Sequence, residues 1–181
     1  VGSNRVQAET AILDDLTGRL LEFVKLDSHE TISRKEQFNP SDLINDLLIR
    51  FEPVIEYKNL SVNKEISFSS TFRGDKSALT SAFLNILDNA FKYTPRNGNI
   101  IVRILSVDGF FETSVINTFN EMDQIQLDNI FKPFERSRRS DAAGSGLGLA
   151  ITKKIIEKHG GKINALNSEE GFEIRVTLPL N

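Results

Sequence analysis

Two pairs of strand-like segments constrain the fold of this chain more than any other feature. The first pair, Asn99–Val107 and Phe110–Asn117, is joined by Asp108-Gly109, which is a two-residue hairpin signal. The second pair, Lys162–Asn167 and Gly171–Leu178, closes the sequence. Because strands joined by tight turns run antiparallel, the pattern predicts a largely antiparallel sheet.

Amphipathic helices are predicted before and between these hairpins. Asp75 is a candidate N-cap for a long helix whose apolar residues continue to Phe91. A second helix is predicted for Leu147–His159, with Gly160-Gly161 as its C-cap. With the helices on one face of a mixed sheet, we expect an α+β two-layer sandwich, preceded by one long N-terminal helix.

Other elements are less regular. A helix is predicted to open at Pro40, and Pro53 is expected to kink or end it unless a second helix starts there. Val62–Phe68 alternates like a strand, and a short helix is predicted near Asp123–Phe131. The polar segment Ser28–Asn39 shows no periodicity and is predicted to be a linker.

The N-terminal segment Val6–Asp27 predicts a helix with an apolar seam. Four apolar residues recur at 3-4-3 spacing: Leu13, Leu16, Leu20 and Phe23. This spacing is typical of a helix that packs on another helix. Two alternatives stay open, a partner helix or the domain that follows. We expect residues 1–37 to form a helical segment with its linker, and residues 38–181 to form the main domain.

Composition excludes several functions. With 22 Lys and Arg against 25 Asp and Glu, the net charge of −3 leaves no basic surplus, and no nucleic-acid partner is predicted. The absence of cysteine excludes disulfides, thiolate zinc sites and cysteine nucleophiles. No apolar run approaches the roughly 20 residues of a membrane span.

Two polar patterns could carry chemistry. Asn85, Asn89 and Lys92 stand at i, i+4 and i+7 on one helical face, followed by Tyr93. Amide oxygens suit Mg²⁺, a lysine neutralises phosphate, and a tyrosine ring can flank a nucleoside, although a solvated helix face would show the same pattern. The second pattern, Gly144–Leu149, runs straight into a helix, where backbone N–H groups suit phosphate. A glycine cluster for helix packing is its alternative.

These motifs resemble the ATP-binding catalytic domain of sensor histidine kinases, within the ATPase group shared with Hsp90, type II topoisomerases and MutL. Asn85–Thr94 is similar to the N box of that family, and Ile130–Arg136 is similar to its F box and adjoining arginine. Gly144–Ile151 is similar to its G2 box. The resemblance covers about Phe38 to Leu180, with the motifs in the family's order.

The resemblance implies roles for the matching residues, with ATP and Mg²⁺ as cofactors. Asn89 would coordinate the nucleotide-bound Mg²⁺ and Asn85 would support the hydrated metal and the phosphates. Lys92 and Tyr93 would contact phosphate and nucleoside, and Arg136 would meet the γ-phosphate. Asn85, Lys92 and Arg136 are the implied catalytic residues. Residues 137–143 would form a lid, and the G2 residues would close it over the triphosphate. These G2 residues are Gly144, Ser145, Gly146, Leu147 and Gly148.

The sequence departs from the family in its G1 box, where Asp-x-Gly-x-Gly is expected. Asn117 stands at the Asp position, so it keeps a carbonyl acceptor for the adenine amino group but lacks the charge. Phe119 and Glu121 replace the glycines, and the Phe119 ring either crowds the adenine site or stacks on the base.

Neither histidine matches the family's phosphoacceptor box. His29 lies in the predicted linker, and His159 at a helix C-terminus is expected to be structural, with a cation favoured by the helix dipole. The N-terminal helix resembles the second helix of the dimerisation hairpin. We therefore expect this chain to be part of a longer kinase, whose first hairpin helix carries the phosphoacceptor.

The implied function is transfer of the ATP γ-phosphoryl group to a histidine outside this chain, for signalling to a response regulator receiver domain. The parent is expected to be a homodimer in the bacterial cell membrane, with this domain in the cytoplasm. Two alternatives stay open: a degenerate nucleotide-site module that docks on the helical hairpin without catalysis, and an anti-sigma-type serine kinase relative.

Overall fold

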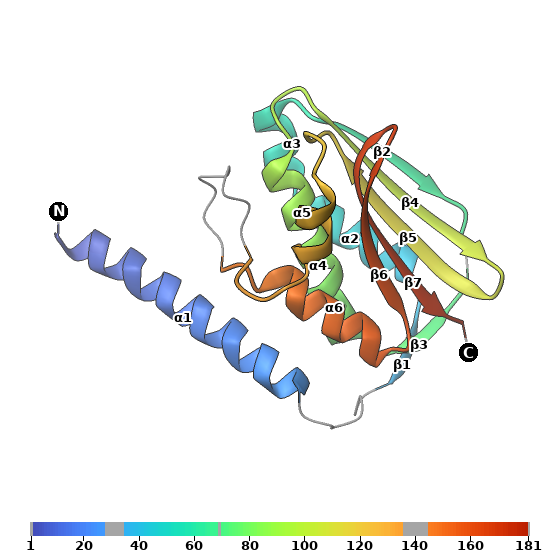
Figure 1. The fold of residues 1–181 in the computed structure, drawn as a ribbon, viewed down its shortest axis with the longest axis horizontal. Helices are drawn as coiled ribbons and strands as arrows, with labels where there is room; N and C mark the ends of the chain where they lie inside the picture. The colour runs from blue at the N-terminus through green and yellow to red at the C-terminus, as the bar shows by residue number, and fades with distance from the viewer. Residues whose placement is uncertain (1, 28–34, 69, 136–144, 181) are drawn as a thin grey trace.

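The computed structural model describes residues 2–27, 35–68, 70–135 and 145–180. Its helices are α1 Gly2–Asp27, α2 Pro40–Ile49, α3 Glu52–Lys58, α4 Lys76–Tyr93, α5 Gln124–Asn129 and α6 Gly148–Lys158. Its strands are β1 Glu36–Phe38, β2 Ser61–Ile66, β3 Phe72–Gly74, β4 Asn99–Val107, β5 Phe110–Asn117, β6 Lys162–Ser168 and β7 Gly171–Pro179. Helices α2, α4 and α6 lie on one face of the main sheet, and α1 lies outside α6 (Figure 1).

The main sheet has five strands in the order β2-β4-β5-β7-β6. Both predicted hairpins form, as β4–β5 and β6–β7, and the antiparallel pairing of β5 with β7 joins them. The edge strand β2 runs parallel to β4. The predicted two-layer sandwich with a mixed, largely antiparallel sheet is therefore confirmed.

The core lies between this sheet and the helices. On β4, Ile100, Val102 and Ile104 are fully buried, whereas the alternate residues are partly exposed. On α4, Leu79, Ile86 and Phe91 belong to the same buried cluster. Burying an aliphatic side chain of this size contributes roughly 1.5–3 kcal/mol, so the apolar face of α4 orients the helix on the sheet.

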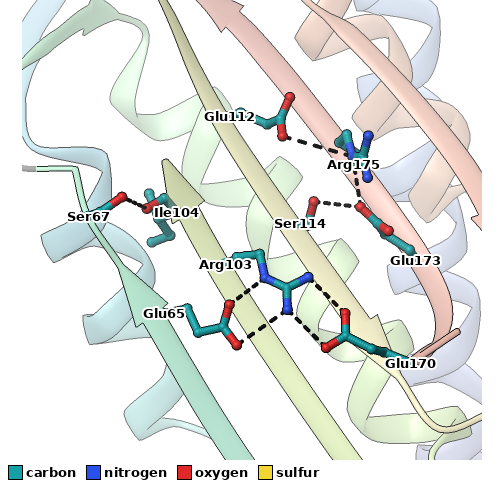
Figure 2. A network of polar contacts seen from close by, with 9 residues as sticks. All are labelled: Glu65, Ser67, Arg103, Ile104, Glu112, Ser114, Glu170, Glu173 and Arg175. Atoms are coloured by element: carbon teal, nitrogen blue, oxygen red, sulfur yellow. Dashed lines mark hydrogen bonds and ion pairs between the residues drawn. The ribbon is translucent and has the colours of Figure 1, made fainter. Parts of the chain in front are cut away.

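Charged side chains connect the strands across the other face of the sheet (Figure 2). Arg103 on β4 bonds both Glu65 of β2 and Glu170 of the β6–β7 turn, the latter at 2.9 and 3.0 Å. Hydrogen bonds from Arg103 hold the pKa of Glu170 below its usual value. Beside them, Glu173 is 3% exposed and accepts from Ser114 at 2.7 Å and from Arg175 at 2.8 Å.

Part of the predicted linker is a strand, so that prediction was wrong for residues 36–38. Strand β1 pairs antiparallel with β3, a second short strand absent from the sequence prediction. Phe38 is 7% exposed and meets Phe72 edge-to-face, with ring centroids 6.0 Å apart. Strands of three residues are too short for alternation to reveal them, and the packing of Phe38 is what orders this segment.

The predicted helix boundaries follow from their caps. Pro53 stands in the first turn of α3, so the second of the two outcomes predicted for it is confirmed: a new helix starts there. Asp75 caps α4 by accepting from the Ala78 N–H at 3.0 Å. The short helix α5 begins with a capping box between Asp123 and Gln126.

Helix α1 lies along α6 of its own domain. Phe23 packs partly against the core, and the Lys154 ammonium lies 4.5 Å from the centre of its ring. Leu13, Leu21 and Val24 remain 61%, 55% and 57% exposed. Contact with the following domain, one of the two alternatives left open for this helix, thus forms on one side of α1. An apolar stripe on the other side stays exposed. None of the helices in the described ranges combines the length and apolarity that crossing a membrane requires.

His159 is structural, as predicted, but as a neutral ring and not as a cation. Its Nδ1–H donates to the Ile155 carbonyl at 2.7 Å, and its Nε2 accepts from the Asp75 N–H at 3.1 Å. Burial of the ring lowers the pKa of His159. The ring thus connects the end of α6 to the N-cap of α4.

Protonation of His159 should destabilise the fold. The pKa of His159 is lower in the folded chain than in the unfolded chain, where it is about 6.5. The neutral ring therefore contributes to the free energy of unfolding above pH of about 6.5, and this contribution is lost as the pH falls below that value. Between pH of about 7.5 and about 5.5, we expect the wild-type chain to lose up to about 1.4 kcal/mol per pH unit more unfolding free energy than His159→Gln. Urea unfolding at both pH values measures this, and equal losses would contradict it.

Candidate functional site

The predicted polar stripe lies on the side of α4 that is turned away from the core. Asn85, Asn89, Lys92 and Tyr93 are all half-buried, which a fully solvated helix face would not show. The Asn85 Nδ2 donates to the Gly148 carbonyl at 3.3 Å. The stripe therefore meets the start of α6, and the structure brings the two predicted motifs together at one place.

The end of α4 is held by a lysine from α3. The Lys58 ammonium donates to the carbonyls of Phe91, Lys92 and Thr94 at 2.8, 2.9 and 2.9 Å. These contacts use all three of its donors and satisfy carbonyls that the end of a helix leaves without partners. Burial lowers the pKa of Lys58. Lys58 thus positions the turn that carries Lys92 and Tyr93.

The described part of the glycine-rich segment is anchored by side chains of the segment itself and of α6. Leu147 is fully buried, and its N–H donates to the Ser145 Oγ at 3.3 Å. Thr152 donates to the Gly148 carbonyl at 2.9 Å. Helix α6 has no acidic residue in its first turn, so the N–H groups at its start remain suited to an anion.

Gly146 joins this segment to the F-box turn. Its φ is +71°, and a Cβ there would lie 3.0 Å from the backbone of Phe134. The Phe134 N–H donates to the Gly146 carbonyl at 3.0 Å. The chain on either side of residues 136–144 is thereby brought together. The predicted sites Arg136 and Gly144 and the predicted lid lie outside the described residues, as does His29.

Three aromatic rings lie beside the predicted base-recognition residue. Phe119 meets Tyr93 on one side and Phe172 on the other, each with ring centroids 6.2 Å apart. Asn117 pairs with Phe172 across β5 and β7 and is 4% exposed. The structure thus places Tyr93, Asn117 and Phe119 in one neighbourhood. Glu121 is exposed.

Asn117 has acceptor capacity left at this position. Within the described ranges, its side chain makes one hydrogen bond, from Nδ2 to the Thr118 carbonyl at 3.3 Å. Gly171 of the neighbouring strand has a φ of +138°, and a Cβ there would lie 2.4 Å from the Asn117 carbonyl oxygen. Only glycine allows β7 to approach so closely.

The donor set around Asn89 fits one type of metal site. No described residue hydrogen-bonds to its half-buried side chain, which leaves the amide oxygen available within those ranges. The described residues contain no group of three or more His, Asp or Glu side chains that could hold a metal ion. Mg²⁺ commonly keeps several waters and takes one or two protein oxygens together with phosphates. The residues present suit that arrangement and not a cage made by the protein.

Three residues of this region were not predicted from sequence. Phe172 reaches the aromatic cluster because β7 pairs with β5, a long-range pairing without a local signal. Lys58 lies in a different helix from the carbonyls it binds. Arg19 of α1 donates to the Asn85 Oδ1 at 3.3 Å across 66 residues of sequence. A correct prediction of the strand order would have placed Phe172 beside Asn117. No local sequence pattern indicates that Lys58 and Arg19 reach this region.

Comparisons with known proteins agree with this geometry. A family model for the histidine kinase-, DNA gyrase B- and HSP90-like ATPases matches residues 74–181. The chain is 29% identical over 163 residues to the sensor histidine kinase CusS of Escherichia coli K12, covering 88% of this chain and 34% of CusS. It is 29% identical over 177 residues to the heme sensor protein HssS of Staphylococcus haemolyticus, covering 97% and 38%. The chain thus spans little more than a third of these relatives.

Solved structures of histidine kinases show the same fold. The catalytic domain of histidine kinase ThkA superposes with a TM-score of 0.74 at 28% identity, over 81% of this chain and 98% of that one. ThkA in complex with the response regulator protein TrrA gives a TM-score of 0.80 at 26% identity, over 98% and 50%. The chain belongs to the histidine kinase-, DNA gyrase B- and HSP90-like ATPase family.

Proposed function

We propose that this chain is the ATP-binding catalytic part of a sensor histidine kinase. One observation carries the proposal: the Asn85–Lys92 face of α4 meets the glycine-rich start of α6, through the Asn85–Gly148 hydrogen bond. This arrangement offers amide oxygens, an ammonium and free helix N–H groups to a triphosphate. Relatives described as sensor histidine kinases support it.

In the proposed site each residue has a separate task. Asn89 contributes the protein oxygen to Mg²⁺, and Asn85 contacts the metal's water and the phosphates. Lys92 and Arg136 neutralise negative charge on the phosphates, and the backbone of residues 144–148 closes over them. Bound Mg²⁺ supplies charge neutralisation for the γ-phosphoryl group. Transfer breaks the bond from γ-phosphorus to the bridging oxygen, forms one to an imidazole nitrogen and releases ADP.

The base is proposed to enter beside Asn117. The amide oxygen of Asn117 accepts a hydrogen bond from the adenine amino group and takes the place of the carboxylate in the family's motif. Phe119, which lies between Tyr93 and Phe172, then lines the base. Contact between a base and such a ring adds to apolar burial, as aromatic pairs do by about 0.5–1.5 kcal/mol.

One observation favours a second function. The Phe119 ring lies where the family's motif has glycine, and it touches aromatic rings on both sides. If those rings stay together, a base cannot enter, and the chain is a docking module without catalysis. The unoccupied hydrogen-bonding capacity of Asn89 and Asn117 favours the kinase, because a module without nucleotide has no use for either.

The proposed partners follow from α1 and from the histidines. The exposed stripe with Leu13, Leu21 and Val24 suits the first helix of the hairpin, which also dimerises the parent. Both ring nitrogens of His159 are bonded inside the fold, so the phosphoacceptor is proposed to lie in that first helix. A response regulator receiver domain is the proposed recipient, and ThkA was solved in complex with the response regulator protein TrrA.

The metal role of Asn89 is tested by removing its amide. Asn89→Ala should abolish Mg²⁺-dependent binding of ATP and leave the fold intact, because the residue faces away from the core. Isothermal titration with Mg²⁺ and a non-hydrolysable ATP analogue measures the affinity, and circular dichroism checks the fold. Asn63→Ala, at an exposed asparagine of β2, is the matched control. Unchanged affinity in folded Asn89→Ala would remove Asn89 from the site.

The role of Phe119 is decided by the sign of one substitution. Phe119→Gly should weaken ATP binding by about threefold to tenfold, since the base loses the ring that lines it. Phe110→Gly, at the end of β5 that lies far from Phe119, controls for the loss of a phenylalanine ring outside the proposed site. Tighter binding in Phe119→Gly would show that the ring obstructs the site and would favour the docking module.

The location of the phosphoacceptor predicts a negative result. With labelled ATP alone, this chain should form no acid-labile phosphohistidine. Phosphohistidine should form only when the first hairpin helix is supplied as well. Autoradiography after alkaline and acid washes distinguishes the species. Phosphorylation of His29 or His159 in the chain alone would refute the proposed acceptor.

A further inference from the structure

The N-terminal helix contributes a cation to the candidate site. Arg19 is half-buried, and its Nη1 donates to the Asn85 Oδ1 at 3.3 Å. The same nitrogen lies 3.7 Å from the position that a Cβ on Gly148 would take. The guanidinium therefore lies where the polar stripe of α4 meets the start of α6.

Neighbouring contacts fix this position. One turn further along α1, Glu22 accepts a hydrogen bond from Ser81 at 3.3 Å, and Ser81 lies one turn before Asn85 on α4. The two contacts therefore set α1 and α4 in one antiparallel register. On the α6 side, the Lys154 ammonium lies over the Phe23 ring. These contacts of α1 with α4 and α6 therefore position Arg19 at the site.

The electrostatics at this point favour an anion. A helix N-terminus carries partial positive charge that favours an anion, and α6 has no acidic residue of its own in its first turn. A phosphate between this N-terminus and Arg19 would interact favourably with both. A guanidinium is charged at all relevant pH values, and its planar fork of N–H groups matches phosphate oxygens.

We propose that Arg19 binds the phosphates of the nucleoside triphosphate, as a residue of the site contributed by α1. This inference rests on the proposed function and adds a ligand from outside the ATPase family's matched residues 74–181. Docking of α1 on α4 and α6 and binding of the triphosphate then favour each other.

The test is titration of the full chain with a non-hydrolysable ATP analogue and, separately, with AMP, both with Mg²⁺. Arg19→Gln should weaken analogue binding about tenfold and AMP binding less, and Arg19→Lys should recover part of the loss. Glu22→Gln, which removes a charge one turn away but keeps a side-chain acceptor for Ser81 and does not touch Asn85, is the control and should change affinity less than about twofold. Circular dichroism verifies that each variant folds.

Each other outcome has a defined meaning. If the wild-type chain binds and Arg19→Gln binds equally well, Arg19 is not a phosphate ligand. If Arg19→Gln binds more tightly, Arg19 competes with the nucleotide for Asn85, and the inference is overturned. If the wild-type chain binds neither ligand, the proposed function fails, and this inference fails with it.

Discussion

The packing of α4 on the sheet is the constraint on which the rest of this structure depends. Leu79, Ile86 and Phe91 are buried against the strands, so the rotation of the helix about its axis is set by apolar burial. Once that face is fixed, helical periodicity turns Asn85 and Asn89 toward α6. The site is therefore a consequence of the core, and a helix rotated by a quarter turn would bury its amides.

Three long-range polar contacts keep this helix in place. His159 bonds the backbone at the N-cap of α4, and Lys58 binds the carbonyls at its other end. Between them, Asn85 bonds the start of α6. Each contact satisfies backbone groups or amides that would otherwise lack partners. Losing one of these contacts would therefore leave a polar group without a hydrogen bond and would also let α4 shift.

The base end of the site has a different chemistry from the phosphate end. Near Gly148 the groups are positive or polar, whereas beside Asn117 the surroundings are aromatic, with Phe119 and Phe172 in contact. A neutral amide in an apolar setting can offer either an acceptor or a donor, whereas a carboxylate offers acceptors alone. The two ends thus suit the two parts of a nucleotide, and the aromatic rings set how much room the base has.

The sequence by itself determined the fold class, both hairpins, the N-cap of α4 and the face that carries Asn85, Asn89 and Lys92, because these follow from patterns within about 20 residues. The metal and catalytic roles of those residues stay predictions. Only the tertiary structure decided that β5 pairs with β7, that β1 is a strand, that His159 is neutral, and that Arg19 and Phe172 lie at the site. Each of these joins segments far apart in the chain, where packing and desolvation, not local pattern, select the contact.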